Sequence, residues 1–427
     1  MRKVRNETWV ALVLVLMGVQ PMARASDTKL SEQLKKVFSD RRLEGATVGA
    51  QVFSLDAEKE LFSLHADRPM MPASALKVFT AAAALDCLGP EYLYKTEVLS
   101  VGKLVQGTLH GDLFLRGNGD PSMVTERMDL LAREVAKSGI KGIQGNVFVD
   151  DSAFEAPNRP IARKVADTER AFNAPIGALN FNYNSIELDP GARRASGVRY
   201  QSVADPSLHS GQALVEALKL QGVRIAIKPG AISRRTTPAN AEMVGSLDSY
   251  PLREIVVLMN KYSNNFIADD LVKTMGLRKH GPPATLENGL AVLRDYAKTW
   301  KLDDSMVFES GSGLQRGNRA TAESFIHLFR SISKQFGIYP EFLSSLPLAG
   351  RDGTLRDRLK KSLELGVVRA KSGTIDGVAS LVGVIRTSKG DTRAFAVMVN
   401  LPEPVSRDLR FWEDDFIRLV MTSDEAG

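Results

Sequence analysis

A serine and a lysine three residues apart, Ser74 and Lys77, are the pair in this chain whose residue types and spacing best suit covalent chemistry. Pro72 cannot lie inside a helix, and the Ala-rich residues from Ser74 to Leu88 favour a helix that begins at or next to Ser74. Residues three apart share one face of a helix, so the Lys77 amine could accept the proton of the Ser74 hydroxyl. The positive end of the helix would stabilise the alkoxide that develops. The pair therefore predicts a serine nucleophile that works without histidine.

The tetrapeptide alone is not specific, because S-x-x-K also begins at Ser100, Ser138 and Ser331. Two further motifs follow Ser74 in order along the chain. Ser263 and Asn265 form S-x-N just before a predicted helix, and Lys371-Ser372-Gly373 forms K-[ST]-G at the end of a predicted strand. A second K-S-G begins at Lys137, but it precedes Ser263 and lies at a helix end. The ordered triple is typical of serine acyltransferases and hydrolases of one mechanistic class.

In acyl transfer, each residue of the first two motifs would have its own task. Ser74 attacks a carbonyl, and Lys77 takes its proton if neighbouring groups lower the pKa of the amine. Ser263 can relay the proton to a leaving amine. The Asn265 amide can orient Lys77 and bind the substrate backbone.

The third motif has an electrostatic task. Lys371 supplies a positive charge that keeps Lys77 deprotonated and attracts a substrate carboxylate, which Ser372 can also bind. Gly373 allows close approach of the backbone. The backbone N–H groups of Ser74 and Thr374 would form the oxyanion hole.

The second motif can be aligned in two ways. Tyr262-Ser263-Asn264 also satisfies a Y-x-N pattern, in which tyrosine is the relay. Both frames cannot face one site. We favour Ser263 and Asn265, on the family resemblance given below.

The elements that must position these motifs predict an α+β fold. Two predicted strands near the N-terminus and three near the C-terminus would form one five-stranded antiparallel sheet with flanking helices, over 47–55, 60–64, 367–371, 379–385 and 392–401. That sheet joins 26–92 and 243–427 into one domain. Residues 93–242, with short strands, Gly-rich turns and helices at 125–137 and 211–220, form a smaller inserted α+β domain, and 236–240 is a candidate linker.

The N-terminus indicates export. Arg2, Lys3 and Arg5 precede an apolar run from Trp9 to Val19, and Ala23-Arg24-Ala25 matches a cleavage site, so 1–25 is a predicted signal peptide. An uncleaved anchor is the competing interpretation.

The formal net charge is +6, and half of it lies in the leader. The small positive charge that remains on the rest of the chain does not indicate nucleic-acid binding. It would suit at most peripheral contact with an anionic wall or membrane surface.

The sequence contains no recognisable metal or cofactor motif. Its five histidines lack metal-ligand spacing, and its one cysteine, Cys87, cannot form an intrachain disulfide. We expect neither a metal nor a cofactor, and a stability that depends on a large core.

Nearly all of the chain after the leader resembles the class C low-molecular-mass penicillin-binding proteins, the D-Ala-D-Ala carboxypeptidase/endopeptidases of peptidase family S13 (penicillin-binding protein 4 type). The resemblance is carried by the three motifs and by the blocks Leu115–Ser122, Val149–Phe154, Asn260–Asn265, Gly311–Arg316, Leu346–Thr354 and Ala370–Thr374.

The resemblance implies a serine DD-peptidase fold, related to the β-lactamases, with an insert between the first two motifs. It also implies an enzyme that is acylated by peptidoglycan stem peptides and inhibited by β-lactams. The predicted signal peptide would place this enzyme in the periplasm or otherwise outside the cytoplasm. In the family, an aspartate of the insert and an arginine after the G-S-G-L block hold the diamino-acid side chain of the stem peptide. The matching positions are Asp150, with Asp151 adjacent to it, and Arg316.

This sequence departs from the family pattern in three places. The third motif has Ser372 where threonine is usual, which keeps the hydroxyl, and Asp376 stands where some members have glutamine. The interval from Ser74 to Ser263 is shorter than in the family's three-domain form, and we expect the family's third domain to be absent after Leu188–Gly191. We expect its absence to leave the surroundings of the site more open.

Two other functions use the same motifs or the same fold. A serine β-lactamase would need an efficient way to hydrolyse its acyl-enzyme, and we find no E-x-x-L-N segment of the class A type. A non-catalytic wall-binding protein would not need to keep Ser74, Lys77, Ser263, Asn265 and Lys371 together.

Overall fold

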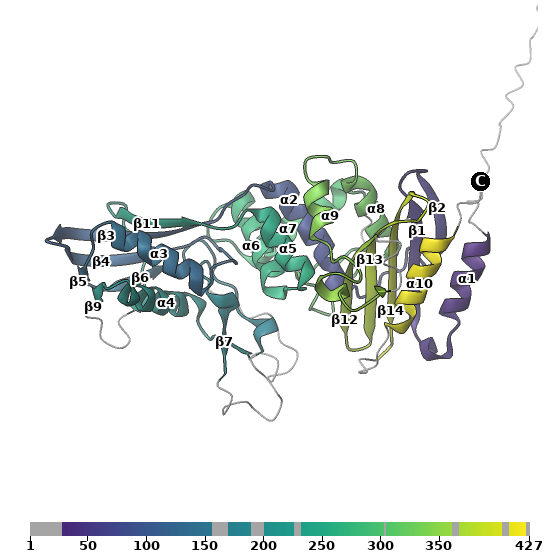
Figure 1. Ribbon diagram of the computed structural model, residues 1–427, viewed down its shortest axis with the longest axis horizontal. Helices are drawn as coiled ribbons and strands as arrows, with labels where there is room; N and C mark the ends of the chain where they lie inside the picture. Colours follow the sequence, from purple (N-terminus) through teal and green to yellow (C-terminus); the bar gives the residue numbers. More distant parts are fainter. Residues whose placement is uncertain are drawn as a thin grey trace, which may run out of the picture.

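Two β-sheets at opposite ends of the molecule are separated by a group of helices (Figure 1). The computed structural model describes residues 28–155, 170–188, 200–225, 232–302, 305–360, 367–403 and 410–423. Three predicted features lie outside the described residues. They are the signal peptide 1–25, residues 158–167, for which the sequence predicts a loop, and residues 189–191, where the family's third domain is expected to be absent. None of the helices in the described ranges is long and apolar enough to cross a membrane.

The first sheet is antiparallel and joins the two ends of the chain, which confirms the predicted five-stranded arrangement. Its strand order is β12-β13-β14-β1-β2, with bounds β1 (Thr47–Ser54), β2 (Lys59–Leu64), β12 (Val368–Ile375), β13 (Val378–Arg386) and β14 (Thr392–Asn400). Strand β12, which carries the third motif, is one edge of this sheet, and β2 is the other.

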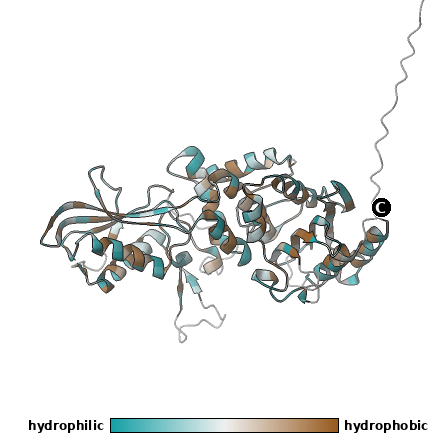
Figure 2. Cartoon of the chain, turned by 45° about the horizontal axis from the view of Figure 1, so that its top comes forward, coloured by the Kyte–Doolittle hydropathy of each residue, from teal (hydrophilic) through white to brown (hydrophobic). Residues whose placement is uncertain are grey.

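Alternate residues of β14 pack into two separate cores, as the two-residue period of a strand requires. Phe395, Val397 and Val399 face helices α1 (Thr28–Phe38) and α10 (Phe411–Thr422). Ala396 and its alternate neighbours face the larger core, to which the central helices belong. The helices have a hydrophobic side and a hydrophilic side (Figure 2). The sheet is therefore covered on both faces, and its β12 edge is held in a fixed position.

Helices α2 (Lys77–Leu88), α5 (Leu252–Lys261), α6 (Asn265–His280), α7 (Leu286–Thr299), α8 (Ala322–Ile332) and α9 (Tyr339–Ser345) make up the middle of the molecule. Sequence periodicity predicts helices over 74–88, 251–259, 266–275, 286–299 and 321–336, so it predicts all of these except α9, and it predicts a longer α8. Helix α2 is buried on nearly every side, because its Ala-rich sequence allows neighbouring helices to approach closely.

The insert is a mixed sheet of seven strands with two helices, α3 (Thr125–Lys137) and α4 (Pro206–Leu220), packed together. The strands are β3 (Lys95–Val105), β4 (Thr108–Arg116), β5 (Gly142–Ile143), β6 (Val147–Asp150), β9 (Arg224–Ile225), β10 (Ile232–Arg234) and β11 (Glu242–Asp248). Strands β4, β6 and β10 pair in parallel, and β3 pairs antiparallel with β4 and β11.

Strand β11 corrects the expected end of the insert. The chain was expected to return to the first domain at 242/243, after the linker 236–240. Instead, Glu242–Asp248 pairs with β3, so the insert's sheet continues to Asp248. The polar segment before it is tied to the insert, since the Thr237 N–H donates to Asp150 Oδ2 at 2.8 Å.

The sequence pattern predicts a further strand of the insert over 182–189, and this prediction is wrong in its first half. Residues Asn182–Asn184 form a 3-10 turn with positive φ values of 48°, 54° and 52°, and only Ser185–Glu187 is a strand. Asparagine tolerates this backbone region because its amide can bond locally. Here Asn184 Oδ1 accepts the Phe181 N–H at 3.0 Å, and Asn184 Nδ2 donates to Asn180 Oδ1 at 2.7 Å.

Candidate active site

Ser74 lies in a short 3-10 turn, Ala73–Leu76, and helix α2 begins only at Lys77. The helix was expected to begin at or next to Ser74. The difference matters because residues three apart align on one side of a 3-10 turn. The Lys77 Nζ is 2.9 Å from Ser74 Oγ as a result.

Lys77 is buried and its Nζ has three acceptors. Besides Ser74 Oγ, it donates to Asn265 Oδ1 and to the backbone oxygen of Ser312, both at 2.7 Å. Burial lowers the pKa of Lys77 to about 7, and the charge of nearby Asp269 opposes this shift. An amine with this pKa is available as a free base at neutral pH.

Asp269 is a site residue that the sequence analysis missed. It lies one turn after Asn265 on α6 and is 6% exposed. Its Oδ1 accepts the N–H groups of Gly311 (2.7 Å) and Ser312 (2.9 Å), which holds the loop that presents the Ser312 carbonyl to Lys77. The only hint in the sequence is the four-residue spacing from Asn265, which places both side chains on one face of a helix.

We predict that Asp269→Asn shifts the acidic limb of the acylation pH profile to lower pH. Asparagine keeps an oxygen for the two N–H groups but removes the negative charge that favours the Lys77 ammonium. The pKa of Lys77 therefore falls further, and the free amine persists at lower pH.

The measurement is the second-order rate of β-lactam acylation from pH 5 to 9. Asp270→Asn is the matched control, since Asp270 is also buried but bonds to Asn180. A limb that stays in place or moves to higher pH would show that Asp269 does not act on Lys77.

The second motif faces the site in the Ser263/Asn265 frame. The Ser263 Oγ accepts a hydrogen bond from Lys371 Nζ at 2.9 Å. Tyr262 is 71% exposed, and the Asn264 side chain instead caps α6 by accepting the Ile267 N–H at 3.1 Å. Neither residue of the Y-x-N frame is thus used at the site.

Lys371 is buried in edge strand β12. Its Nζ also donates to the backbone oxygen of Ser372 at 2.7 Å. Burial, together with repulsion from Lys77, holds the pKa of Lys371 well below its usual value. Two ammonium groups so placed disfavour each other, so the buried pair favours one positive charge over two.

The rest of the third motif lies against the turn that carries Ser74. A Cβ on Gly373 would be 2.4 Å from Ser380 Oγ and 2.6 Å from the Pro72 oxygen, so glycine is required here for close approach. The Ser372 hydroxyl donates to Thr354 Oγ1 at 2.9 Å. Thr354 is a second hydroxyl that the sequence analysis quoted only as part of a family block. Thr374 follows on the same edge strand, where backbone groups can pair with an extended peptide.

Arg316 lies close to the same turn. Its guanidinium donates to the backbone oxygen of Asp376, between β12 and β13, and its Nη1 is 4.0 Å from Met71 Sδ. Arg316 therefore connects the residues just before Ser74 with the end of the strand that carries Lys371.

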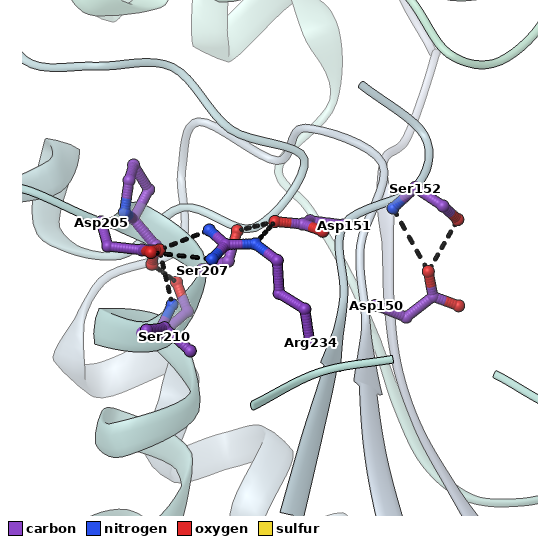
Figure 3. A network of polar contacts seen from close by, with 9 residues as sticks. Asp150, Asp151, Ser152, Asp205, Ser207, Ser210 and Arg234 are labelled. Carbon is purple, nitrogen blue, oxygen red and sulfur yellow. Dashed lines mark hydrogen bonds and ion pairs between the residues drawn. The ribbon is translucent and has the colours of Figure 1, made fainter. Parts of the chain in front are cut away.

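Asp150 and Asp151 are engaged within the insert (Figure 3). Asp150 is 3% exposed, and its Oδ1 accepts the Ser152 N–H (3.2 Å) and hydroxyl (2.7 Å). Asp151 Oδ2 is 2.7 Å from Arg234 Nε and accepts the Ser207 hydroxyl at 2.6 Å. These contacts suit a structural role for both carboxylates, and the predicted contact of Asp150 with substrate stays a prediction.

The insert nevertheless reaches the site through another residue. Asn265 Nδ2 donates to the backbone oxygen of Phe172 at 3.3 Å, and the Phe172 side chain is 44% exposed. Phe172 belongs to a 3-10 turn, Ala171–Asn173, that packs on α6. No sequence pattern indicates this contact, which joins residues 93 positions apart.

Comparison with known proteins agrees with this geometry. A family model described as the D-Ala-D-Ala carboxypeptidase 3 (S13) family matches residues 30–198 and 192–417. The chain belongs to this family. Membership in the S13 family confirms the resemblance drawn from the motifs and makes the chain a hydrolase of the serine D-Ala-D-Ala carboxypeptidase type.

Two relatives named as D-alanyl-D-alanine carboxypeptidases match most of the chain. A D-alanyl-D-alanine carboxypeptidase of Actinomadura sp. (strain R39) is 29% identical over an alignment of 465 positions, gaps included, and the alignment covers 91% of this chain and 85% of the relative. The D-alanyl-D-alanine carboxypeptidase DacB of Haemophilus influenzae is 25% identical over 416 residues, with coverage of 84% and 86%.

Solved structures show the same fold. Penicillin binding protein 4 from Haemophilus influenzae superposes with a TM-score of 0.78 at 23% identity, over 91% of this chain and 98% of that one. The predatory endopeptidase Bd3459 of Bdellovibrio bacteriovorus gives 0.57 at 21% identity, over 87% and 91%. The serine DD-peptidase fold with an insert is therefore confirmed.

Proposed function

We propose that this chain is an exported, penicillin-sensitive D-Ala-D-Ala carboxypeptidase, DD-endopeptidase, or both, which acts on peptidoglycan stem peptides through an acyl-enzyme on Ser74. The observation that supports this most is the meeting of three motifs that are far apart in sequence. Lys77 Nζ bonds Ser74 Oγ and Asn265 Oδ1, and Lys371 Nζ bonds Ser263 Oγ. The names of the S13 relatives and of the endopeptidase with the same fold agree with it.

Acylation begins at Ser74. With Lys77 as a free amine, the Ser74 hydroxyl donates to it and transfers its proton as Oγ attacks the carbonyl carbon before the terminal D-Ala. The Ser74 and Thr374 N–H groups hold the oxyanion. Penicillin is attacked in the same way, and its opened ring stays on Oγ as an ester.

Departure of the amine needs a proton and a bound carboxylate. Ser263 receives a proton from the lysine pair and passes it to the leaving nitrogen. The Ser263 Oγ can do so because it is 2.9 Å from Lys371 Nζ. The substrate carboxylate binds beside Lys371, with the Ser372 and Thr354 hydroxyls as further donors. Water then hydrolyses the ester and frees Ser74.

Two residues are proposed to contact the diamino-acid side chain of the stem peptide. Arg316 is supported by its position between Met71 and Asp376, next to the turn that carries Ser74. Asp150 is supported only by its match to the family pattern, since its carboxylate already has partners within the insert.

Digestion of purified peptidoglycan tests the function directly. We expect the wild-type enzyme to release D-Ala from pentapeptides, to cut the cross-link between D-Ala and the diamino acid, or both, as resolved by chromatography and mass spectrometry. Nitrocefin is the companion substrate: near-stoichiometric acylation agrees with the proposal. Sustained rapid nitrocefin turnover with an unchanged muropeptide profile would identify a β-lactamase instead.

A further inference from the structure

The 346–354 loop (Leu346–Thr354) covers one half of edge strand β12 and leaves the other half free. The Ala370 N–H donates to the Pro347 oxygen at 3.0 Å, and the described residues show no backbone bond between loop and strand beyond that point. Alternate residues of a strand direct their backbone groups to the same side. Ser372 and Thr374 therefore present theirs at the free part of the edge, where an extended substrate can pair.

Thr354 ends the 346–354 loop at this boundary. Its Oγ1 accepts the Ser372 hydroxyl at 2.9 Å, so the position of Thr354 sets the geometry of the hydroxyl pair that is proposed to bind the substrate carboxylate. Gly353, just before it, has a φ of 57°, and a Cβ there would lie 2.7 Å from the Lys261 backbone oxygen. Glycine thus allows the loop to lie directly against the end of α5.

The Lys261 ammonium joins the two ends of the 346–354 loop. Its Nζ donates to the backbone oxygen of Leu346 at 2.9 Å and to Asp352 Oδ2 at 2.7 Å. Asp352 Oδ1 accepts the Leu348 N–H at 2.8 Å, which closes the loop on itself. The Lys261 side chain is only 14% exposed, so these oxygens, rather than water, define where its ammonium lies.

Ser263 depends on the same end of α5. Its φ is 54°, in the left-handed region that a residue other than glycine occupies only where its surroundings hold it. It follows Lys261 by two residues, and Asn260 Nδ2 donates to Ser345 Oγ at 2.8 Å, directly before the loop. The backbone that carries Ser263 is therefore bonded to the segment that carries Thr354.

We propose that the Lys261–Asp352 ion pair positions Thr354 against Ser372 and thereby sets how strongly the enzyme recognises the carboxylate of its substrate. Both members of the pair act through Thr354, so they are positioning residues. The proposal rests on the proposed function in one respect, which is that the Ser372 and Thr354 hydroxyls bind that carboxylate. Without the pair, the loop keeps its backbone bonds to β12 but loses the contact that fixes its last residues. Recognition of the carboxylate should therefore suffer more than the chemistry at Ser74.

The test compares acylation by benzylpenicillin with acylation by its methyl ester, which keeps the β-lactam carbonyl but has no free carboxylate. The readout is the ratio of the two second-order rate constants, and the wild type should favour the acid. Asp352→Asn keeps an oxygen for the Leu348 N–H but removes the charge opposite Lys261, and we expect it to lower the ratio at least fivefold. Lys261→Met should do the same, and the double variant should fall no further than the worse single variant. Lys261→Arg, which keeps the charge, should retain at least half of the wild-type ratio.

Asp414→Asn is the matched control. It removes an ion pair of 2.7 Å with Arg358, four residues after Thr354, but it leaves the 346–354 loop and its contacts unchanged. Its ratio should stay within about twofold of the wild type, and circular dichroism first establishes that every variant is folded. An unchanged ratio in Asp352→Asn, or an equal slowing of both compounds, would overturn the proposal, since a purely structural pair would not distinguish acid from ester.

A binding measurement separates this proposal from the proposed function. A peptide ending in D-Ala-D-Ala, and the same peptide with a C-terminal amide, are titrated calorimetrically into Ser74→Ala protein, which needs neither acylation nor turnover. A further Asp352→Asn should weaken binding of the acid at least fivefold and leave binding of the amide within about twofold. Failure of the wild type to form an acyl-enzyme would contradict the proposed function alone. Absence of acid binding at millimolar peptide, or equal binding with and without Asp352→Asn, would overturn the role of the ion pair.

Discussion

Replacing Ser74 with alanine is expected to abolish both covalent labelling by penicillin and release of D-Ala from a pentapeptide muropeptide. The acyl-enzyme ester needs the Ser74 oxygen, and the lysine beside it has no other nucleophile to activate. Loss of a serine nucleophile typically lowers turnover by more than about 10⁴-fold. Labelling is followed by intact-protein mass, and D-Ala release by chromatography of the muropeptides.

The chain supplies a matched control for this substitution. Ser138 also begins an S-x-x-K tetrapeptide and lies within the second K-S-G, but its hydroxyl caps the end of α3 by donating to the Val135 oxygen at 2.7 Å. Ser138→Ala should label like the wild type. If Ser74→Ala were still labelled, the nucleophile would lie elsewhere.

Lys77→Met is expected to slow β-lactam acylation by about 10² to 10⁴-fold, the usual contribution of a general base. Methionine fills a similar volume but cannot accept the Ser74 proton. It also leaves Asn265 Oδ1 and the Ser312 oxygen without their donor, at a cost of about 1–3 kcal/mol for each buried group that stays unpaired. The rate is measured by stopped flow with a chromogenic β-lactam.

The pH dependence separates loss of the base from general damage. In the wild type, acylation should rise with pH and level off above about pH 7, because Lys77 becomes a free amine above its pKa. The residual rate of Lys77→Met should lack this limb. An unchanged limb in the variant would assign it to another group and remove Lys77 from the role of base.

The sequence predicted the parts of the fold that depend on local pattern. The five strands of the first sheet and most helices follow from periodicity, and the three motifs could be read because their order is specific even where each is common. Strand β11 was missed because Glu242–Asp248 has little alternation and pairs with a strand far earlier in the chain. The left-handed turn at 182–184 was missed because asparagine side-chain bonds decide its backbone.

The site was predictable to the extent that its chemistry lies in motifs. Asp269 was missed because a carboxylate within a helix usually faces solvent, and only the fold places it beneath the 311–312 backbone. Phe172 was missed because its contact is made by a backbone oxygen, which has no residue-type signature. Asp150 shows the opposite case, in which a family pattern names a residue whose contacts within the insert suit a structural role.

The most direct test of the account is peptide mapping of the wild-type protein after brief exposure to benzylpenicillin. The account predicts one adduct of about the mass of intact benzylpenicillin per chain, on the peptide that contains Ser74, and slow release of that adduct. An adduct on a different serine, or no adduct while the antibiotic is hydrolysed rapidly, would contradict it.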